Sequence, residues 1–188
     1  MSEHNRALAA LTGLAIGDAL GMPTQLMSRQ QVAARYGAIT TFLPAADDHP
    51  LAAGMPAASI TDDTEQALLT ARLIIEGHGH VEPATFAREL VAWEDGMRAK
   101  GSLDLLGPST KRAVDAVLAG ESLEEAGRYG TTNGAAMRVT PVGLARSTRD
   151  LPALVDLVVE VSLVSHNTGI ALAGAAAVAA AVSAGIDG

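Results

Sequence analysis

The sequence predicts an all-helical protein that forms a single domain over residues 1–188. Apolar residues make up 48% of the chain, but aromatic residues make up only 3%. A core built mostly of Ala, Leu and Val favours closely packed helices over sheets, which use more aromatic and β-branched residues. No segment alternates apolar and polar residues as a half-buried strand does. At this length the chain can bury a substantial core.

The first predicted helix spans residues 6–20. Its apolar residues recur at helical spacing, and Asp18 falls on the same face as Leu11 and Leu14. A carboxylate on a buried face needs a partner, because burying an unpaired charge is costly. Three glycines fall four residues apart on this helix, and we interpret them as a surface for close helix packing: Gly13, Gly17 and Gly21.

The remaining elements follow a long irregular connection. Residues 22–60 are rich in Pro, Gly, Ala and Asp, and we expect one short helix there, at 28–36. Capping residues and prolines then predict helices at 61–77, 83–100, 109–119, 123–126 and 152–164. The last segment, 168–186, has no charged residue and is dominated by Ala and Gly. Its weak hydrophobicity predicts a central helix wrapped by other helices rather than a membrane span.

Charge and cysteine content exclude several classes of protein. The net charge is -8, with no block of Lys or Arg, which argues against non-specific binding to nucleic acid. The chain has no cysteine, so it has neither disulfides nor thiolate metal ligands. Its first residues lack the basic-then-apolar order of a signal peptide. We therefore expect a cytoplasmic protein with no nucleic-acid or membrane partner.

The run Thr61-Asp62-Asp63-Thr64-Glu65 lies where a loop ends and a helix begins. Two adjacent carboxylates between two hydroxyls offer the oxygen ligands that Mg²⁺ or Mn²⁺ prefers. An ordinary helix cap is the alternative, because Thr61 or Asp62 could accept hydrogen bonds from free backbone amides.

The segment Thr131 to Arg138 could bind an anion. Asn133 and Gly134 tolerate the left-handed conformation that turns consecutive amides toward one point, and a helix starting near Ala135 would add its positive end. Arg138 could add a charge. The alternative is a turn followed by an ordinary helix start, with Arg138 in a surface ion pair.

One histidine, His166, ends a strongly apolar run, where a structural hydrogen bond is the commoner role. A Ser-His-Asp hydrolase is disfavoured, because the sequence has no Gly-x-Ser-x-Gly motif. A Walker phosphate loop is absent too.

In order and spacing, four segments resemble the motifs of the ADP-ribosylglycohydrolase family. Its Gly-Asp-Ala-Leu-Gly helix matches residues 17–21, and its Thr-Asp-Asp-Thr helix start matches 61–64. Its Asn-Gly-Ala-x-Met-Arg loop matches 133–138, and its Ser-His segment begins at Ser165. Together these motifs cover most of the chain.

The resemblance implies a single orthogonal helical bundle with two divalent cations, usually Mg²⁺ or Mn²⁺. It also implies hydrolysis of a glycosidic bond at C1 of a ribose. The substrate would be a small-molecule or protein-linked ADP-ribosyl compound. Carboxylates stabilise the oxocarbenium-like transition state of such a reaction, and a metal activates water.

Carried over by motif, Thr61, Asp62 and Asp63 would be metal ligands, and Asp62 or Asp63 would accept the proton of the attacking water. The segment from Gly130 to Met137 would hold the diphosphate, and His166 would approach the ribose or the phosphates. The full implied substrate-binding set is Asp18, Gln25, Gly130, Asn133, Gly134, Ala135, Met137 and His166.

Two departures from the family pattern leave other functions open. Gln25 stands where many members have Glu, and a neutral amide cannot act as a base. A later Asp-x-Asp-Thr motif has no match, so we expect a bundle without its C-terminal helices, whose exposed apolar surface would promote self-association. The alternatives are a catalytically impaired nucleotide-binding relative and a purely structural helical domain.

Overall fold

The computed structural model describes residues 2–102 and 106–188, and every regular element within them is helical, which confirms the all-α prediction. Most helix boundaries lie within one to three residues of the expected ones. Helix α7 matches the helix expected to start near Ala135, whereas α8 and the two 3₁₀ turns were not predicted. The elements are α1 Glu3–Gly21, η1 Met22–Thr24, α2 Arg29–Tyr36, α3 Asp62–Glu76, α4 Pro83–Ala99, α5 Pro108–Leu118, α6 Leu123–Gly127, α7 Gly134–Met137, α8 Thr140–Ala145, η2 Thr148–Asp150, α9 Leu151–His166 and α10 Gly169–Asp187.

Local caps explain where the helices start. At α2, the Ser28 hydroxyl accepts a hydrogen bond from the Gln31 amide, while the Gln31 side chain accepts one from the Ser28 amide. At α10, the Thr168 hydroxyl accepts a hydrogen bond from the Ala171 amide. Proline stands in the first turn of α4, α5 and α9, where its missing N–H leaves no helix hydrogen bond unmade.

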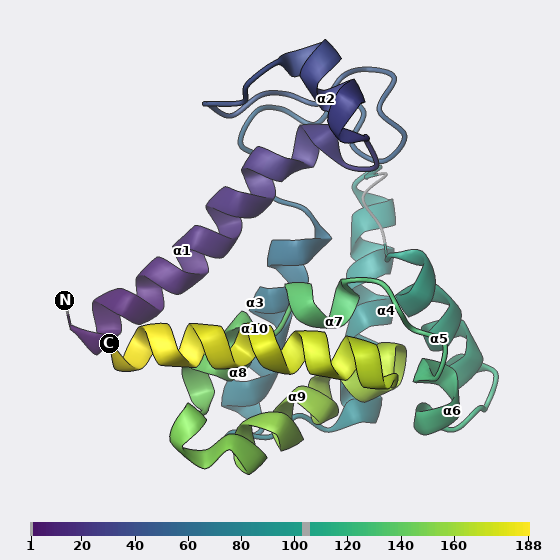
Figure 1. Cartoon of the computed structure of the whole chain (residues 1–188). Coiled ribbons are helices and arrows are strands. Elements are labelled where there is room, and N and C mark those ends of the chain that lie inside the picture. Colours follow the sequence, from purple (N-terminus) through teal and green to yellow (C-terminus); the bar gives the residue numbers. More distant parts are fainter. Residues whose placement is uncertain (1, 103–105) are drawn as a thin grey trace.

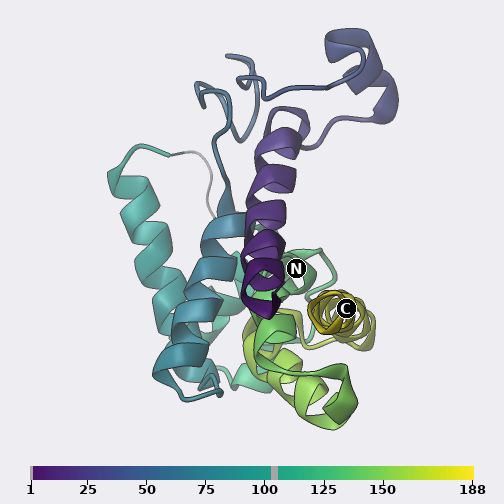
Figure 2. The ribbon, with the colours of Figure 1, turned by 90° about the vertical axis from the view of Figure 1, so that its left-hand side faces the viewer.

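The core lies where α9 packs between α4, α5, α6 and α10. Buried side chains of α9 recur at helical spacing and meet those of α3 and α4; they include Leu69, Leu73, Phe86, Leu90, Leu154, Leu157, Val158 and Val161. Figure 2 shows α3 and α4 running side by side, with α10 seen almost end-on. This packing holds the first turn of α3 above the core.

The prediction of a fully wrapped C-terminal helix is wrong. Helix α10 lies across the front of the molecule in Figure 1 and buries one side only, through Ala171, Ala175 and Ala179. Its opposite side is an uncharged stripe, which we call the α10 stripe: Ile170, Ala173, Gly174, Ala177, Val178 and Ala181. Helix α10 and the segment Glu3–Thr24 are long and apolar enough to cross a membrane, a test that core helices of soluble proteins also pass.

The interpretation of the α1 glycines as a packing surface is also wrong. An added Cβ at Gly13, Gly17 or Gly21 would meet nothing within 4 Å among the described residues. Helix α1 buries only Ala19, and it contacts α3, α8 and α10. Near its start, the Arg6 Nε donates a hydrogen bond to the Ile186 carbonyl at 2.5 Å.

Candidate active site

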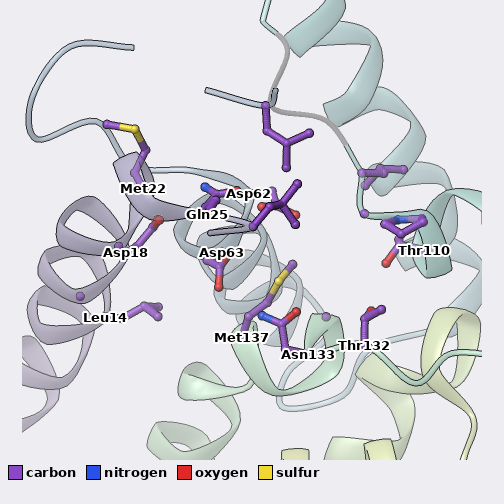
Figure 3. A pocket seen from close by; sticks show the side chains of 18 of the residues that line it. Leu14, Asp18, Met22, Gln25, Asp62, Asp63, Thr110, Thr132, Asn133 and Met137 are labelled. Atoms are coloured by element: carbon purple, nitrogen blue, oxygen red, sulfur yellow. The ribbon is translucent and has the colours of Figure 1, made fainter. Parts of the chain in front are cut away.

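One cavity of about 870 Å³ opens between α1, α3, α5 and the segment that leads into α7. The three glycines of α1 form part of its wall, which explains why no other helix packs on them. Figure 3 shows acidic side chains of α1 and α3 near one another, with Asn133 and Thr132 lower in the view. The lining residues are Gly13, Leu14, Gly17, Asp18, Gly21, Met22, Gln25, Leu26, Leu51, Asp62, Asp63, Leu106, Gly107, Pro108, Thr110, Thr132, Asn133, Gly134 and Met137.

Asp18 connects α1 to the first turn of α3. Its carboxylate accepts hydrogen bonds from the Thr61 amide at 2.8 Å and the Thr61 hydroxyl at 2.7 Å. It also accepts from the Thr64 amide at 3.2 Å and the Thr64 hydroxyl at 2.6 Å. The amide and hydroxyl donors at the start of α3 therefore find their acceptor on a different helix. The same hydrogen bonds supply the partners that the Asp18 carboxylate requires.

Asp62 and Asp63 both face the cavity from the first turn of α3. Asp62 accepts a hydrogen bond from the Gln66 side chain at 3.3 Å. The Asp63 amide donates to the Thr61 hydroxyl at 3.4 Å, so Thr61 is also the N-cap of α3, as the alternative to metal binding proposed. Burial, together with the neighbouring Asp18 charge, raises the pKa of Asp63.

The expectation of a left-handed turn at Asn133 and Gly134 is wrong. Asn133 has φ -72°, and Gly134 and Gly130 are not among the residues with positive φ. Gly130 and Gly134 instead allow their segment to pack closely against the end of α9. A Cβ on Gly130 would lie 1.9 Å from the Ser165 carbonyl oxygen, and one on Gly134 would lie 2.6 Å from the His166 ring. The segment therefore lies directly against the end of α9.

Arg138 is neither a surface residue nor a cavity residue, which corrects both interpretations of its role. Its side chain is fully buried, at 0% exposure, with the guanidinium carbon 5.1 Å from the centre of the Phe86 ring. One terminal nitrogen donates to the Gln66 carbonyl oxygen at 3.3 Å, and the other donates to the Ser165 hydroxyl at 2.6 Å. Burial lowers the pKa of Arg138 to about 10, while the negative charge of Asp62 acts in the opposite direction. The guanidinium is therefore still a cation at neutral pH.

His166 is also buried, and it lies directly behind two residues of the cavity wall, Thr132 and Gly134. Arg138 donates a hydrogen bond to its Nδ1 at 3.2 Å, so Nδ1 must be the acceptor. Nε2 then carries the proton and donates to the Thr132 hydroxyl at 2.9 Å. Burial and the Arg138 charge lower the pKa of His166 to about 4, so the ring is neutral near pH 7.

The structure brings most of the predicted site residues to one cavity. Seven of them line it: Asp18, Gln25, Asp62, Asp63, Asn133, Gly134 and Met137. Four others lie behind its wall: Thr61, Gly130, Ala135 and His166. The predicted roles of all eleven stay predictions. Thr132 lies within the segment predicted to hold the diphosphate, although it was not named singly. The sequence prediction missed Gln66, for which the i, i+4 spacing from Asp62 was the signal.

The two carboxylates of Asp62 and Asp63 provide fewer protein ligands than a metal site usually has. Within residues 2–102 and 106–188, no three His, Cys, Asp or Glu side chains group closely enough to hold a metal ion. Mg²⁺, however, keeps several waters and is often held by one or two protein carboxylates together with substrate oxygens. The oxygen donors of Asp62 and Asp63 therefore fit such an ion in chemistry.

Comparisons with known proteins identify the family and the fold. The sequence model of the ADP-ribosylglycohydrolase family matches residues 1–188. The chain is 39% identical to the uncharacterized protein YegU of Escherichia coli K12, over 99% of this chain and 55% of that protein. It is 32% identical to the ADP-ribosyl-[dinitrogen reductase] glycohydrolase of Rhodospirillum rubrum, over 77% of this chain and 46% of that enzyme. A solved structure described as an ADP-ribosylglycohydrolase-related protein complex superposes with a TM-score of 0.70 at 25% identity, covering 95% of this chain and 55% of that one.

The chain therefore belongs to the ADP-ribosylglycohydrolase family, a class of glycohydrolases with an all-helical fold. It spans about half the length of the curated relatives it matches.

Proposed function

We propose that the cavity binds an ADP-ribosyl or related ribosyl compound and that the protein hydrolyses the glycosidic bond at C1 of its ribose. The convergence of Asp18, Asp62 and Asp63 on one cavity, from two helices, is the observation that carries this proposal. Anionic side chains at that point would stabilise the positive charge that develops at an anomeric carbon. The R. rubrum relative supports the ADP-ribosyl class by its name.

In the proposed reaction, a water oxygen bonds to C1 while the bond from C1 to the leaving nitrogen or oxygen breaks. The bonding electrons stay on the leaving atom. Asp62 or Asp63 accepts a proton from the attacking water, and this proton is then returned to the leaving atom, which regenerates the carboxylate. Thr132 and Asn133, which also line the cavity, would bind the ribose or phosphate oxygens. Leu26, Leu51 and Met22 would limit the access of bulk water.

Asp62 and Asp63 would hold Mg²⁺ or Mn²⁺ at the cavity wall. The family motif implies Thr61 as a further ligand, but its hydroxyl lies behind the wall and donates to Asp18. When bound, such an ion would supply positive charge that fixes ribose hydroxyls and lowers the pKa of a nearby water.

Calorimetric titration of Mg²⁺ and Mn²⁺ into the 188-residue chain tests the metal part directly, with Asp62→Ala alongside. Saturable binding that disappears in the variant is the expected result. Turnover is tested with ADP-ribosyl-arginine and ADP-ribosyl-serine compounds, where Asp63→Asn and a chelator should both abolish hydrolysis. Hydrolysis that survives both would contradict the proposal.

A second function, binding without hydrolysis, is favoured by Gln25. This residue places a neutral amide in the cavity wall, where it cannot act as a general base. A binder would retain affinity for ADP-ribose in calorimetry but would release no product from either ADP-ribosyl compound. An enzyme would do both.

A further inference from the structure

The candidate site has a buried support behind its wall, to which the Arg138 side chain is central. Arg138 lies outside the cavity, yet its hydrogen bonds lead to two different parts of the cavity wall. We propose that Arg138 is a positioning residue that holds Asp62 through Gln66 and Thr132 through His166. Only the expected effect of Arg138 on catalysis rests on the proposed function. The positioning of Asp62 and Thr132 can be observed without a substrate.

The first arm leads to the acidic part of the wall. Arg138 can only donate, so the Gln66 side chain must turn its carbonyl oxygen toward the guanidinium, at 3.3 Å. The amide nitrogen of Gln66 then points the other way and donates to Asp62 at 3.3 Å. Gln66 is fully buried, so water does not compete for either group. Arg138 thereby selects which end of the Gln66 amide faces Asp62.

The second arm leads to the segment before α7. The Nδ1 atom of His166 lies 3.2 Å from a guanidinium nitrogen of Arg138 and 2.8 Å from the Ser165 hydroxyl. With Nδ1 as the acceptor from Arg138, the proton lies on Nε2, which donates to Thr132 at 2.9 Å. The same guanidinium nitrogen donates to Ser165 at 2.6 Å, which holds the end of α9 in place. Arg138, together with Ser165, therefore orients the ring behind Thr132.

Burial of a guanidinium is unfavourable unless the surroundings compensate for it. The described acceptors of Arg138 are neutral, and its Nε has no hydrogen-bond partner among the described residues. Its face packs on Phe86, and the charge of Asp62 acts on it from beyond Gln66. A buried cation with so little direct compensation is better explained by what it orients than by the stability it adds.

Carbon-detected and imidazole nitrogen NMR on the 188-residue chain tests the inference without substrate. Arg138→Met should shift both the Asp62 carboxyl carbon and the Thr132 methyl resonances, and should shift the Nδ1 resonance of His166, which loses one of its two contacts. Gln66→Met breaks only the first arm, so it should shift Asp62 and leave Thr132 in place. The control is Arg149→Met, which removes an exposed arginine and should shift neither signal.

Two results would overturn the inference: a folded Arg138→Met protein with both signals unmoved, or Gln66→Met with Asp62 unmoved. The second result decides the question even where Arg138→Met does not fold. In turnover assays, Arg138→Met should lower kcat roughly 10- to 100-fold, the usual effect of removing a group that orients site ligands, while KM changes much less. If the wild-type chain showed no turnover, this result would contradict the proposed function but not the positioning role of Arg138, because the NMR measurement does not depend on catalysis.

Discussion

Asp18 on α1 and Thr61 at the start of α3 are joined by two hydrogen bonds, at 2.8 Å to the Thr61 amide and 2.7 Å to its hydroxyl. The two residues are 43 positions apart in the chain, so this pair fixes the acidic part of the cavity by a tertiary contact. Replacing Asp18 should therefore change stability as well as function.

We expect Asp18→Ala to lower the free energy of unfolding by about 2 kcal/mol, because donors of Thr61 and Thr64 lose their acceptor. Urea denaturation followed by circular dichroism measures this loss. The matched control is Asp95→Ala, an exposed aspartate on α4, which should change the value by less than about 0.5 kcal/mol. Equal effects of the two substitutions would contradict the capping role.

A pair of glycine substitutions tests the close approach of residues 130–134 to α9. Gly130→Ala would put a Cβ 1.9 Å from the Ser165 carbonyl oxygen, so we expect a loss of about 2 kcal/mol or more. Gly96→Ala, in the open interior of α4, should instead raise stability by about 0.5–1 kcal/mol. The two thermal midpoints should move in opposite directions, and a tolerated Gly130→Ala would refute the packing.

His166 makes stability depend on pH. Its pKa falls from 6.5 to about 4 on folding, so the unfolded chain binds more protons between these values. Lowering the pH from 6.5 to 4 should therefore destabilise the fold through this residue, by roughly 3 kcal/mol in total. The advantage of wild type over His166→Gln in urea midpoints should shrink over that range. Parallel pH curves for the two proteins would show that His166 is not the cause.

Gln25 lies in the same cavity wall as Asp18, Asp62 and Asp63. Gln25→Glu adds a carboxylate there, so we expect Mg²⁺ or Mn²⁺ to bind roughly three- to tenfold more tightly, since affinity rises with ligand charge. Calorimetry measures the change, with Gln30→Glu on the exposed side of α2 as the control. Unchanged affinity in Gln25→Glu would mean that position 25 is remote from the ion.

The α10 stripe should promote self-association of this chain, because it presents a continuous uncharged surface, with Ile170 74% exposed. Light scattering should detect dimers or larger species, and Ile170→Glu combined with Ala177→Glu should shift them toward monomer. Ile75→Glu removes an equally exposed apolar residue on α3 and should leave the association unchanged. A wild-type monomer at all concentrations would contradict this prediction.

Helix positions were predictable because their signals are local. Ser28 and Thr168 cap the helices that follow them, and Pro83 and Pro108 stand in first turns. The cavity was predictable in part, because Asp18, Asp62 and Asn133 belong to motifs that lie far apart in the chain but together in the family pattern.

What could not be predicted depends on contacts between distant segments. The burial of Arg138 requires hydrogen-bond acceptors from α3 and α9. The residues next to Arg138 in the sequence give no indication of these acceptors. The role of Gly130 depends on the end of α9, 35 residues away in the chain. The exposure of one side of α10 could not be predicted either. Its composition is uniformly rich in Ala, so no polar side of the helix indicated which residues face the solvent.

Two side-chain hydrogen bonds anchor α1 near its ends, from Arg6 to the last turn of α10 and from the start of α3 to Asp18, and α1 also contacts α8. Between these attachments it buries no side chain, and its glycines border the cavity. The position of α1 therefore sets the width of the binding space. The size of the accepted ligand would then be governed by the two anchor points as much as by the residues that touch the ligand.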